Sequence, residues 1–269
     1  MLRNQDTHEI PNLFKYIQMT LAGNNHSPQY GTVGTPKKFY AVWKEKDVDL
    51  SGVVNERTAS PLGKTIYALF EKERVVELLH SFVIFDGKVK KIARYQQYFA
   101  IESIMERIGK LDNTGRRQGG LIWHTQGSGK SLTMVMLAKV IKRSIVGSKV
   151  IIVTDRKDLD KQIHDTFNNS ELKAVRARSG KDLVSLLQSG KSVITTLIHK
   201  FEKVKKENVT FDDPNTFILV DESHRTQGGD MHKAMKKVFP EACYLGFTGT
   251  PLMRREKNSF AKFGGEIHR

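Results

Sequence analysis

The sequence predicts an α/β fold in which a mostly parallel β-sheet is covered by helices on both faces. From residue 121 onward, short apolar runs alternate with segments that carry apolar residues at helical spacing. The apolar runs are nearly continuous and are bounded by turn residues, as is typical of strands buried on both faces. Polar motifs follow directly after several runs, which is where a parallel sheet places its ligand-binding residues.

The expected elements follow from these patterns in chain order. Strands are predicted at 121–123, 150–154, 192–196, 217–220 and 243–247, and helices between them at 131–143, 158–167, 181–188 and 232–238. Upstream, apolar residues at helical spacing predict helices within 65–85 and at 95–108. Nearer the N-terminus, turn signals separate a helical turn within 13–19 from a short strand at 39–43.

We therefore expect three parts along the chain. Residues 1–60 would form a small α+β segment, residues 61–90 a helical linker, and residues 91–269 the main α/β domain. The first part holds too few apolar residues for a core of its own, so we expect it to be the tail of another domain or a small appendage.

The composition is that of a soluble globular protein with a strong positive charge. Hydrophobic residues make up 39% of the chain, and the net charge of +15 favours polyanionic partners, with nucleic acid as the first candidate. Solvated helix faces would account for the same lysine runs without any ligand. The single cysteine, Cys243, excludes an internal disulfide and fits a buried residue in a reducing compartment. A polar N-terminus and the lack of a long apolar run predict a cytoplasmic protein without membrane contact.

The segment 124–131, with the sequence HTQGSGKS, is the most informative motif. It lies between a predicted strand and a predicted helix, and this order is typical of a phosphate-binding loop. Lys130 is expected to reach the β and γ phosphates of a nucleotide, and the hydroxyl of Ser131 to hold Mg²⁺. The general pattern has glycine where this chain has His124, so the match is imperfect.

An acidic motif, Asp221-Glu222-Ser223-His224, follows the predicted strand 217–220. A carboxylate at the end of a buried strand is costly unless it has a counter-charge, and nucleotide-bound Mg²⁺ is such a partner. Asp221 is expected to hold Mg²⁺, Glu222 to orient or deprotonate the attacking water, and His224 to sense the γ-phosphate or couple to a later strand end. The alternative is an ordinary acidic cap between strand and loop.

Hydroxyl-bearing and basic residues lie at or just after the ends of three further predicted strands. In this position they are candidates for contacts with DNA phosphates or for coupling nucleotide state to a DNA-binding face, although capping and turn roles explain the same residue types. The candidates are Thr154, Arg156, Thr195, Thr196, Thr248 and Thr250. About thirty residues before the phosphate loop, Arg94, Gln96 and Gln97 form a further candidate, because a glutamine amide can pair with an adenine edge.

Taken in order, these motifs resemble those of the first motor domain of superfamily 2 helicases and translocases, which implies a RecA-like P-loop fold. Residues 123–134, WHTQGSGKSLTM, resemble more narrowly the restriction subunit of type I restriction–modification enzymes, whose phosphate loop also carries His-Thr-Gln. The segments 92–100, 153–160 and 221–225 look like motifs of the same family. The resemblance leaves open whether Gln96 or Gln97 faces adenine. It implies nucleotide contacts from the loop and helix start, namely Thr125, Gln126, Gly127, Ser128, Gly129, Lys130, Ser131 and Leu132.

The resemblance also implies cofactors and partners. It implies ATP with Mg²⁺, double-stranded DNA as the moved substrate, and partner methylation and specificity subunits. In that family a nuclease centre precedes the motor, and a second motor domain with an arginine finger follows it. Because neither is recognisable here, we expect the chain to be a fragment whose first 60 residues are the end of the nuclease domain. We expect this fragment to bind nucleotide with little turnover and not to cut DNA.

Two other functions fit the same residues. One is a different superfamily 2 helicase or translocase. The other is a catalytically idle nucleotide-binding module that docks partner subunits. A small-molecule kinase fits less well, because it has no use for the motif at 221–224 together with the Thr-Gly-Thr-Pro sequence at 248–251.

Overall fold

The computed structural model describes residues 2–45, 48, 50, 60–123, 129–169, 172–221, 229–249 and 267, with only the backbone described at 229–232. The chain forms two compact units, Met1–Phe99 and Ala100–Arg269. The predicted linker at 61–90 is thus part of the same unit as residues 1–60. The segment predicted as a helical linker contains the helices α2 and α3 and also an antiparallel hairpin, β3 with β4, and the division of the chain into three parts stays a prediction.

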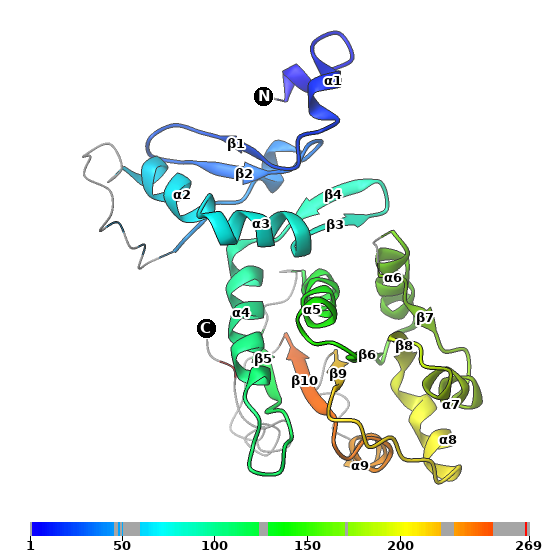
Figure 1. Ribbon diagram of the computed structural model, residues 1–269. Helices are drawn as coiled ribbons and strands as arrows, with labels where there is room; N and C mark the ends of the chain where they lie inside the picture. The colour runs from blue at the N-terminus through cyan, green and yellow to red at the C-terminus, as the bar shows by residue number, and fades with distance from the viewer. Residues whose placement is uncertain are drawn as a thin grey trace. The chain divides into compact units, whose positions relative to one another are not determined.

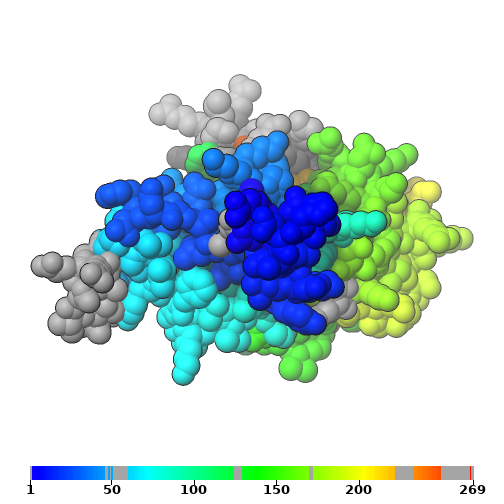
Figure 2. All heavy atoms as spheres, turned by 90° about the horizontal axis from the view of Figure 1, so that it is seen from above, coloured from blue at the N-terminus to red at the C-terminus, as the bar shows by residue number. Residues whose placement is uncertain are grey.

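The first unit is built from short elements (Figure 1). In chain order they are η1 (Arg3–Gln5), α1 (Pro11–Phe14), β1 (Thr20–Ala22), β2 (Gln29–Gly31), η2 (Lys37–Phe39), α2 (Pro61–Leu69), α3 (Lys72–Ser81), β3 (Val83–Asp86), β4 (Val89–Ile92) and the start of α4 (Tyr95–Gly109). Strands β1 and β2 form one antiparallel pair, and β3 and β4 another. Figure 2 shows the face of this unit that the N-terminal segment, in dark blue, and the α2–α3 region, in cyan, present.

Aromatic side chains hold the first unit together. The ring of Trp43 packs against those of Tyr30 and Tyr98, and the Tyr30 hydroxyl donates to the Ala93 carbonyl at 2.8 Å. Arg74 lies over the Trp43 ring and forms a two-pronged ion pair with Glu45, at 2.7 and 3.1 Å. The strand predicted at 39–43 does not form: this stretch contains the last residue of η2 and a single bridge that pairs Ala41 with Tyr30.

The second unit contains a parallel sheet of six strands within the described residues, in the order β5-β10-β9-β6-β8-β7. The strands are β5 (Gly120–Trp123), β6 (Lys149–Thr154), β7 (Val175–Arg176), β8 (Val193–Leu197), β9 (Thr216–Val220) and β10 (Cys243–Thr248). The helices between them are α5 (Lys130–Ser144), α6 (Lys157–Asn168), α7 (Gly180–Gln188), η4 (Ile198–Lys200), α8 (Phe201–Lys206) and α9 (Gly229–Val238). The parallel α/β fold predicted from the sequence is confirmed, and the five strands and four helices predicted from residue 121 onward all form.

Helices cover both faces of this sheet, because successive strand residues point to opposite sides. Ile151, Ile218 and Tyr244 pack into one apolar cluster with the buried residues of α7, α8 and α9. The alternate residues of the same strands, such as Ile152 and Leu219, are also buried, and the helices α5 and α6 contact each other and β6 on that face. Both faces are therefore buried, which explains why the strands are mostly apolar.

Close packing at the start of α7 generates a testable prediction. A Cβ atom added to Gly180 would lie 2.6 Å from the Cβ of Lys203 and 3.0 Å from the Lys200 carbonyl oxygen. We expect Gly180→Ala to lower the free energy of unfolding by about 1–3 kcal/mol, because α7 must move away from α8. Gly109→Ala is the matched control, since that site has open space and no positive φ. It should leave the urea midpoint unchanged or raise it slightly; equal midpoints for the two variants would contradict the packing.

Cys243 in β10 generates a second prediction. Its side chain is 1% exposed, and burial raises the pKa of the thiol to about 12. The native protein should therefore react with a thiol reagent at mildly alkaline pH only as fast as it unfolds, because the thiolate is the nucleophile. Labelling in urea should become fast at the unfolding midpoint. Rapid labelling without urea would show that β10 is open to solvent. Since the unfolded thiol ionises earlier, the stability that this group contributes is present below about pH 8.5 and is lost as pH rises towards the folded value.

Candidate nucleotide site

The sheet register brings the predicted motifs to one edge. Strand β10 lies between β5 and β9, with Thr248 opposite Trp123 and Gly246 opposite Val220. On the other side of β9, Val220 is opposite Val153 of β6. Because all these strands run in the same direction, the loop after β5, Asp221 after β9 and the end of β10 lie along the same carboxyl edge.

Helix α5 begins at Lys130, a few residues after β5 ends at that edge. Gly129, at the N-cap, has φ +89° and ψ +36°, a left-handed conformation that favours glycine. It offers no side chain to cap the helix, and the first turn contains no acidic residue. The Gly129 carbonyl accepts hydrogen bonds from the backbone N–H and the hydroxyl of Thr133, at 3.0 and 3.2 Å. The uncapped helix start and its dipole favour an anion, with Lys130 and Ser131 in the first turn.

Lys130 and Asp221 face each other across the site. The Nζ of Lys130 lies 3.8 Å from Oδ1 of Asp221, and the two side chains are only 14% and 3% exposed. The backbone N–H of Asp221 donates to the Val153 carbonyl at 2.9 Å, which fixes the carboxylate at the end of β9. An ammonium group beside a helix start, with a hydroxyl and a nearly buried carboxylate close by, is a donor set that fits a polyphosphate with a hard cation.

The other strand-end candidates differ in their exposure to solvent. The side chains of Thr154, Thr195, Thr196 and Thr248 are at most 1% exposed, so in this structure they present no surface to DNA. Thr154 donates to the Arg156 carbonyl at 3.3 Å and Thr196 to that of Leu197 at 3.5 Å. Arg156, by contrast, is exposed where α6 begins. This placement favours coupling over direct contact for the threonines, and leaves Arg156 as a candidate for DNA contact.

Several predicted residues cannot be placed at this edge. Thr125, Gln126, Gly127, Ser128, Glu222, His224 and Thr250 lie outside the described residues. Arg94, Gln96 and Gln97 belong to the first unit. There, the side-chain oxygen of Gln97 accepts the backbone N–H of Arg94 at 2.9 Å, and Gln97 is 4% exposed, whereas Gln96 is half-buried. Their contact with adenine stays a prediction.

The sequence reading missed a charged cluster at the other end of the sheet. Asp160 on α6 is fully buried and accepts a hydrogen bond from Nε of Arg176 on β7, at 2.5 Å. One signal was available: with Ile163 and Phe167, Asp160 forms the buried stripe of an amphipathic helix, so a carboxylate stands on an apolar face. Its partner could not be found in this way, because β7 is too short to produce a pattern.

A family model described as the SWI2/SNF2 ATPase matches residues 96–269, which is well over half of the chain. The chain belongs to the SWI2/SNF2 ATPase family. The matched region includes the whole parallel sheet and both members of the Lys130–Asp221 pair. The resemblance to superfamily 2 motor domains is thereby confirmed, and this SWI2/SNF2 chain carries an ATPase domain of that type.

Curated relatives agree with the narrower resemblance. The chain is 30% identical over 96% of its length to a putative type I restriction enzyme endonuclease subunit, MjaIXP, from Methanocaldococcus jannaschii. It is 29% identical over 95% of its length to the type I restriction enzyme HindI endonuclease subunit from Haemophilus influenzae. This SWI2/SNF2 chain spans only about a quarter of the length of these relatives, since it covers 27% of each.

Solved structures show the same fold. A nuclease-deletion mutant of the type ISP restriction–modification enzyme LlaGI, solved with a DNA substrate mimic, matches 66% of this SWI2/SNF2 chain and 19% of its own, with a TM-score of 0.50 and 17% identity. At that identity the likeness concerns the fold alone. In the described parts of the chain, no helix combines the length and the apolar composition that a membrane span requires.

The facing charges generate a third prediction. Without nucleotide, each member of the Lys130–Asp221 pair partly neutralises the other in a nearly dry site. In a double-mutant cycle of Lys130→Met and Asp221→Asn, urea unfolding should give a coupling energy of about 0.5–3 kcal/mol, with the double variant more stable than the sum of the single effects implies. Additive effects would show that the two groups do not interact in solution. Lys205→Met, at an exposed helical lysine, should be additive with Asp221→Asn.

Proposed function

We propose that this chain binds Mg·ATP at the carboxyl edge of its sheet and forms the first motor domain of the restriction subunit of a type I restriction–modification enzyme. The observation that carries the proposal is the meeting of Lys130 and Asp221 beside the uncapped start of α5. The family match to a SWI2/SNF2 ATPase and the relatives among type I endonuclease subunits support it.

The proposed roles follow from the chemistry of each residue. Lys130 and the N–H groups at the start of α5 bind the phosphates, together with the loop at 125–129 and Leu132. Ser131 and Asp221 hold Mg²⁺, which neutralises charge on the phosphate oxygens. Glu222 orients the attacking water and His224 senses the γ-phosphate. Arg94 and either Gln96 or Gln97 lie on the adenine side.

The moved substrate in this proposal is double-stranded DNA. The net charge of +15 favours a polyanion, and Arg156 is exposed beside the carboxyl edge of β6. The buried hydroxyls of Thr154, Thr195, Thr196 and Thr248, with Thr250 beyond them, would transmit nucleotide state to that surface. In the whole enzyme, methylation and specificity subunits would anchor the complex, and ATP hydrolysis would pull DNA past it.

The second motor domain would supply the arginine that completes the ATPase site. In related phosphoryl transfer such an arginine is worth about 10³–10⁵ in rate, so the chain alone should bind nucleotide and turn it over slowly. The relatives named as endonuclease subunits are about four times as long as this chain. Their additional length is enough for a nuclease domain and a second motor domain.

Nucleotide binding provides the test. Binding of a fluorescent ATP analogue, measured by anisotropy with Mg²⁺, should weaken at least tenfold in Lys130→Ala, because the phosphates lose a buried cation. Lys205→Ala, an exposed lysine on α8, is the matched control and should bind as the wild type does. In Asp221→Asn, the gain in affinity on adding Mg²⁺ should disappear while binding without Mg²⁺ persists.

Turnover separates the proposed motor from an idle nucleotide module. Single-turnover hydrolysis by the wild-type chain should exceed that of Lys130→Ala and of Glu222→Gln, and double-stranded DNA should accelerate it. Analogue binding that is equal in the wild type and Lys130→Ala would refute the nucleotide site. Binding without any hydrolysis above the Lys130→Ala background would leave only the module that docks partner subunits.

A further inference from the structure

Exposed hydrophobic side chains are concentrated in the first unit, Met1–Phe99. Within the described residues, all but three of the large hydrophobic side chains that are exposed belong to this unit, although it is the smaller of the two. The exceptions in the second unit are Leu111, Trp123 and Val146, which are far apart along the chain. Isolated hydrophobic residues of that kind occur on most protein surfaces, so only the first unit calls for an explanation.

Helix α2 is apolar around most of its circumference. Its sequence, PLGKTIYAL, contains a single charged residue. One side of the helix is buried, and the residues there are Thr65, Ala68 and Leu69. Ile66 and Tyr67 lie outside that side, as does Phe70 at the C-cap, and these three side chains are between 40% and 44% exposed. Because a helix that is apolar all round is normally buried on more than one side, the open side of α2 is unusual.

Helix α3 extends this outer apolar side. Only Phe70 and Glu71 separate it from α2, so one helix leads directly into the next (Figure 1). Val76 and Leu79 are three positions apart, which places them on the same side of α3, and they are 57% and 38% exposed. Figure 2 shows the α2–α3 region, in cyan, at the surface of the molecule. The buried residues of α3 lie on another side of the helix, and these are Leu78 and Ser81.

Five side chains form what we call the outer face of α2 and α3, namely Ile66, Tyr67, Phe70, Val76 and Leu79. Exposed polar residues flank them on the same helices, namely Lys64, Lys72, Glu73 and His80. Apolar and aromatic side chains with a polar surround are the typical composition of a protein–protein contact. The spacing of three and four positions along two successive helices distinguishes this face from scattered hydrophobic residues.

The length of the curated relatives indicates what covers this face. The MjaIXP subunit aligns with 96% of this chain, and therefore with the region of α2 and α3, yet the chain covers only 27% of that relative. In the relative, the equivalent residues thus belong to a polypeptide about four times as long, most of which lies outside the aligned part. A segment of the same polypeptide is present at a high effective concentration beside the face, whereas a separate protein must bind from solution.

We propose that the outer face of α2 and α3 is an interface between domains, covered in a longer polypeptide by an apolar surface of a further domain. Tyr67 and Phe70 are its expected anchors, because large aromatic side chains contribute most where an interface excludes water. The interface is independent of the proposed ATPase function, since none of its residues is among those proposed to bind Mg·ATP or DNA.

Reporter cysteines provide the test, because the native Cys243 is buried and the pKa of its thiol is raised. Ile66→Cys and Val76→Cys place thiols on the outer face, and Val146→Cys, at a site that is 91% exposed in the second unit, is the matched control. Each variant is labelled with an uncharged thiol reagent, both in this chain and in the full polypeptide that the gene encodes. All three should react rapidly in this chain. In the full polypeptide, the two reporters on the face should react at least about tenfold more slowly, because burial excludes the reagent, while Val146→Cys keeps its rate.

The other results would each overturn the proposal. Reporters on α2 and α3 that react equally fast in both polypeptides would show that no domain covers the face, and so would a gene that encodes no further domain. Reporters that are already slow in this chain would show that the second unit or a second copy covers the face, and sedimentation at the labelling concentration separates those two. Protection that appears only after a purified partner subunit is added would assign the face to a separate protein.

Phe70→Ser tests the expected anchor. In this chain it should leave the urea midpoint nearly unchanged, because the side chain is already exposed. In the full polypeptide it should restore rapid labelling of Val76→Cys, because the interface loses an aromatic side chain, whereas Val146→Ser should not. Protection of Val76→Cys that persists in Phe70→Ser would exclude Phe70 as an anchor. If Ile66→Cys lowers the urea midpoint of this chain, Val76→Cys decides the proposal alone.

Discussion

The parallel register of the six described strands is the constraint on which the rest of the second unit depends. Parallel strands need crossover helices, and these helices bury both faces of the sheet, so the charged side chains of the strands are confined to the strand ends. Every carboxyl end then lies along one edge, whatever its separation in sequence. Lys130 and Asp221 are 91 positions apart by number, yet their side chains come within 3.8 Å because β10 alone lies between β5 and β9.

Burial at that edge strengthens the electrostatic interactions of Lys130 and Asp221. Asp221 is 3% exposed, so its carboxylate has lost most of its hydration. This loss is costly unless a cation compensates for it. Lys130 partly fills that need at 3.8 Å, a distance that is longer than a good charge-assisted hydrogen bond. The two charges are thus close, but the contact between them is longer than a direct hydrogen bond. A phosphate beside the lysine and a divalent cation beside the carboxylate would each allow a shorter contact than this one.

The sequence predicts those parts of the fold that repeat a local pattern over several residues. The strands at β6, β9 and β10 and the helix α5 are found because their apolar residues recur over whole elements. Strand β7 is missed, because Val175 and Arg176 are too few to show a period. The hairpin of β3 and β4 is missed although Asp86-Gly87 is a turn signal, and Gly87 indeed has φ +61°. The reason is that two lysines interrupt the apolar pattern of β4.

The candidate sites divide along the same line. Lys130, Ser131 and Asp221 are predictable, because each belongs to a contiguous motif beside a recognisable strand or helix. The pair of Asp160 and Arg176 is not, since 16 positions and a change of element separate two residues that belong to no motif. Only the position of Asp160 on the buried stripe of α6 indicated that this carboxylate had a partner. Charge pairs between residues of different elements can be identified only once the fold is known.

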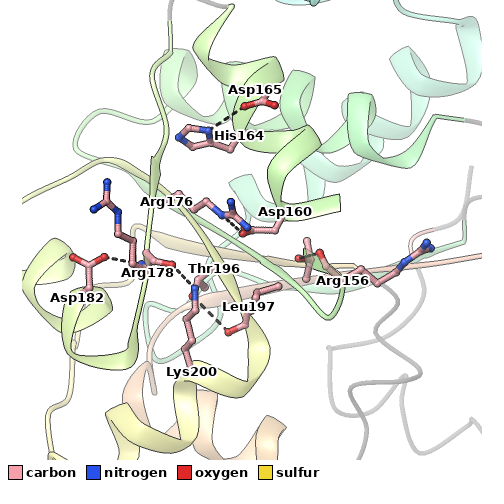
Figure 3. A network of polar contacts seen from close by, with 12 residues as sticks. Arg156, Asp160, His164, Asp165, Arg176, Arg178, Asp182, Thr196, Leu197 and Lys200 are labelled. Atoms are coloured by element: carbon pink, nitrogen blue, oxygen red, sulfur yellow. Dashed lines mark hydrogen bonds and ion pairs between the residues drawn. The ribbon is translucent and has the colours of Figure 1, made fainter. Parts of the chain in front are cut away.

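A short segment of the chain connects Asp221, at the end of β9, with the pair of Asp160 and Arg176. The N–H of Asp221 is bonded to Val153, the next residue, Thr154, is buried and bonded to the Arg156 carbonyl, and α6 begins directly afterwards. Less than one helical turn later, Asp160 accepts the hydrogen bond from Arg176 of β7 (Figure 3). If the end of β9 moves when Asp221 takes a cation, the hydrogen bond to Val153 must stretch or the start of α6 must follow. Arg176 would then move with it, because the fully buried carboxylate of Asp160 is costly to leave without its partner. The end of β9 and the Asp160–Arg176 pair are therefore connected by a short length of chain and two hydrogen bonds.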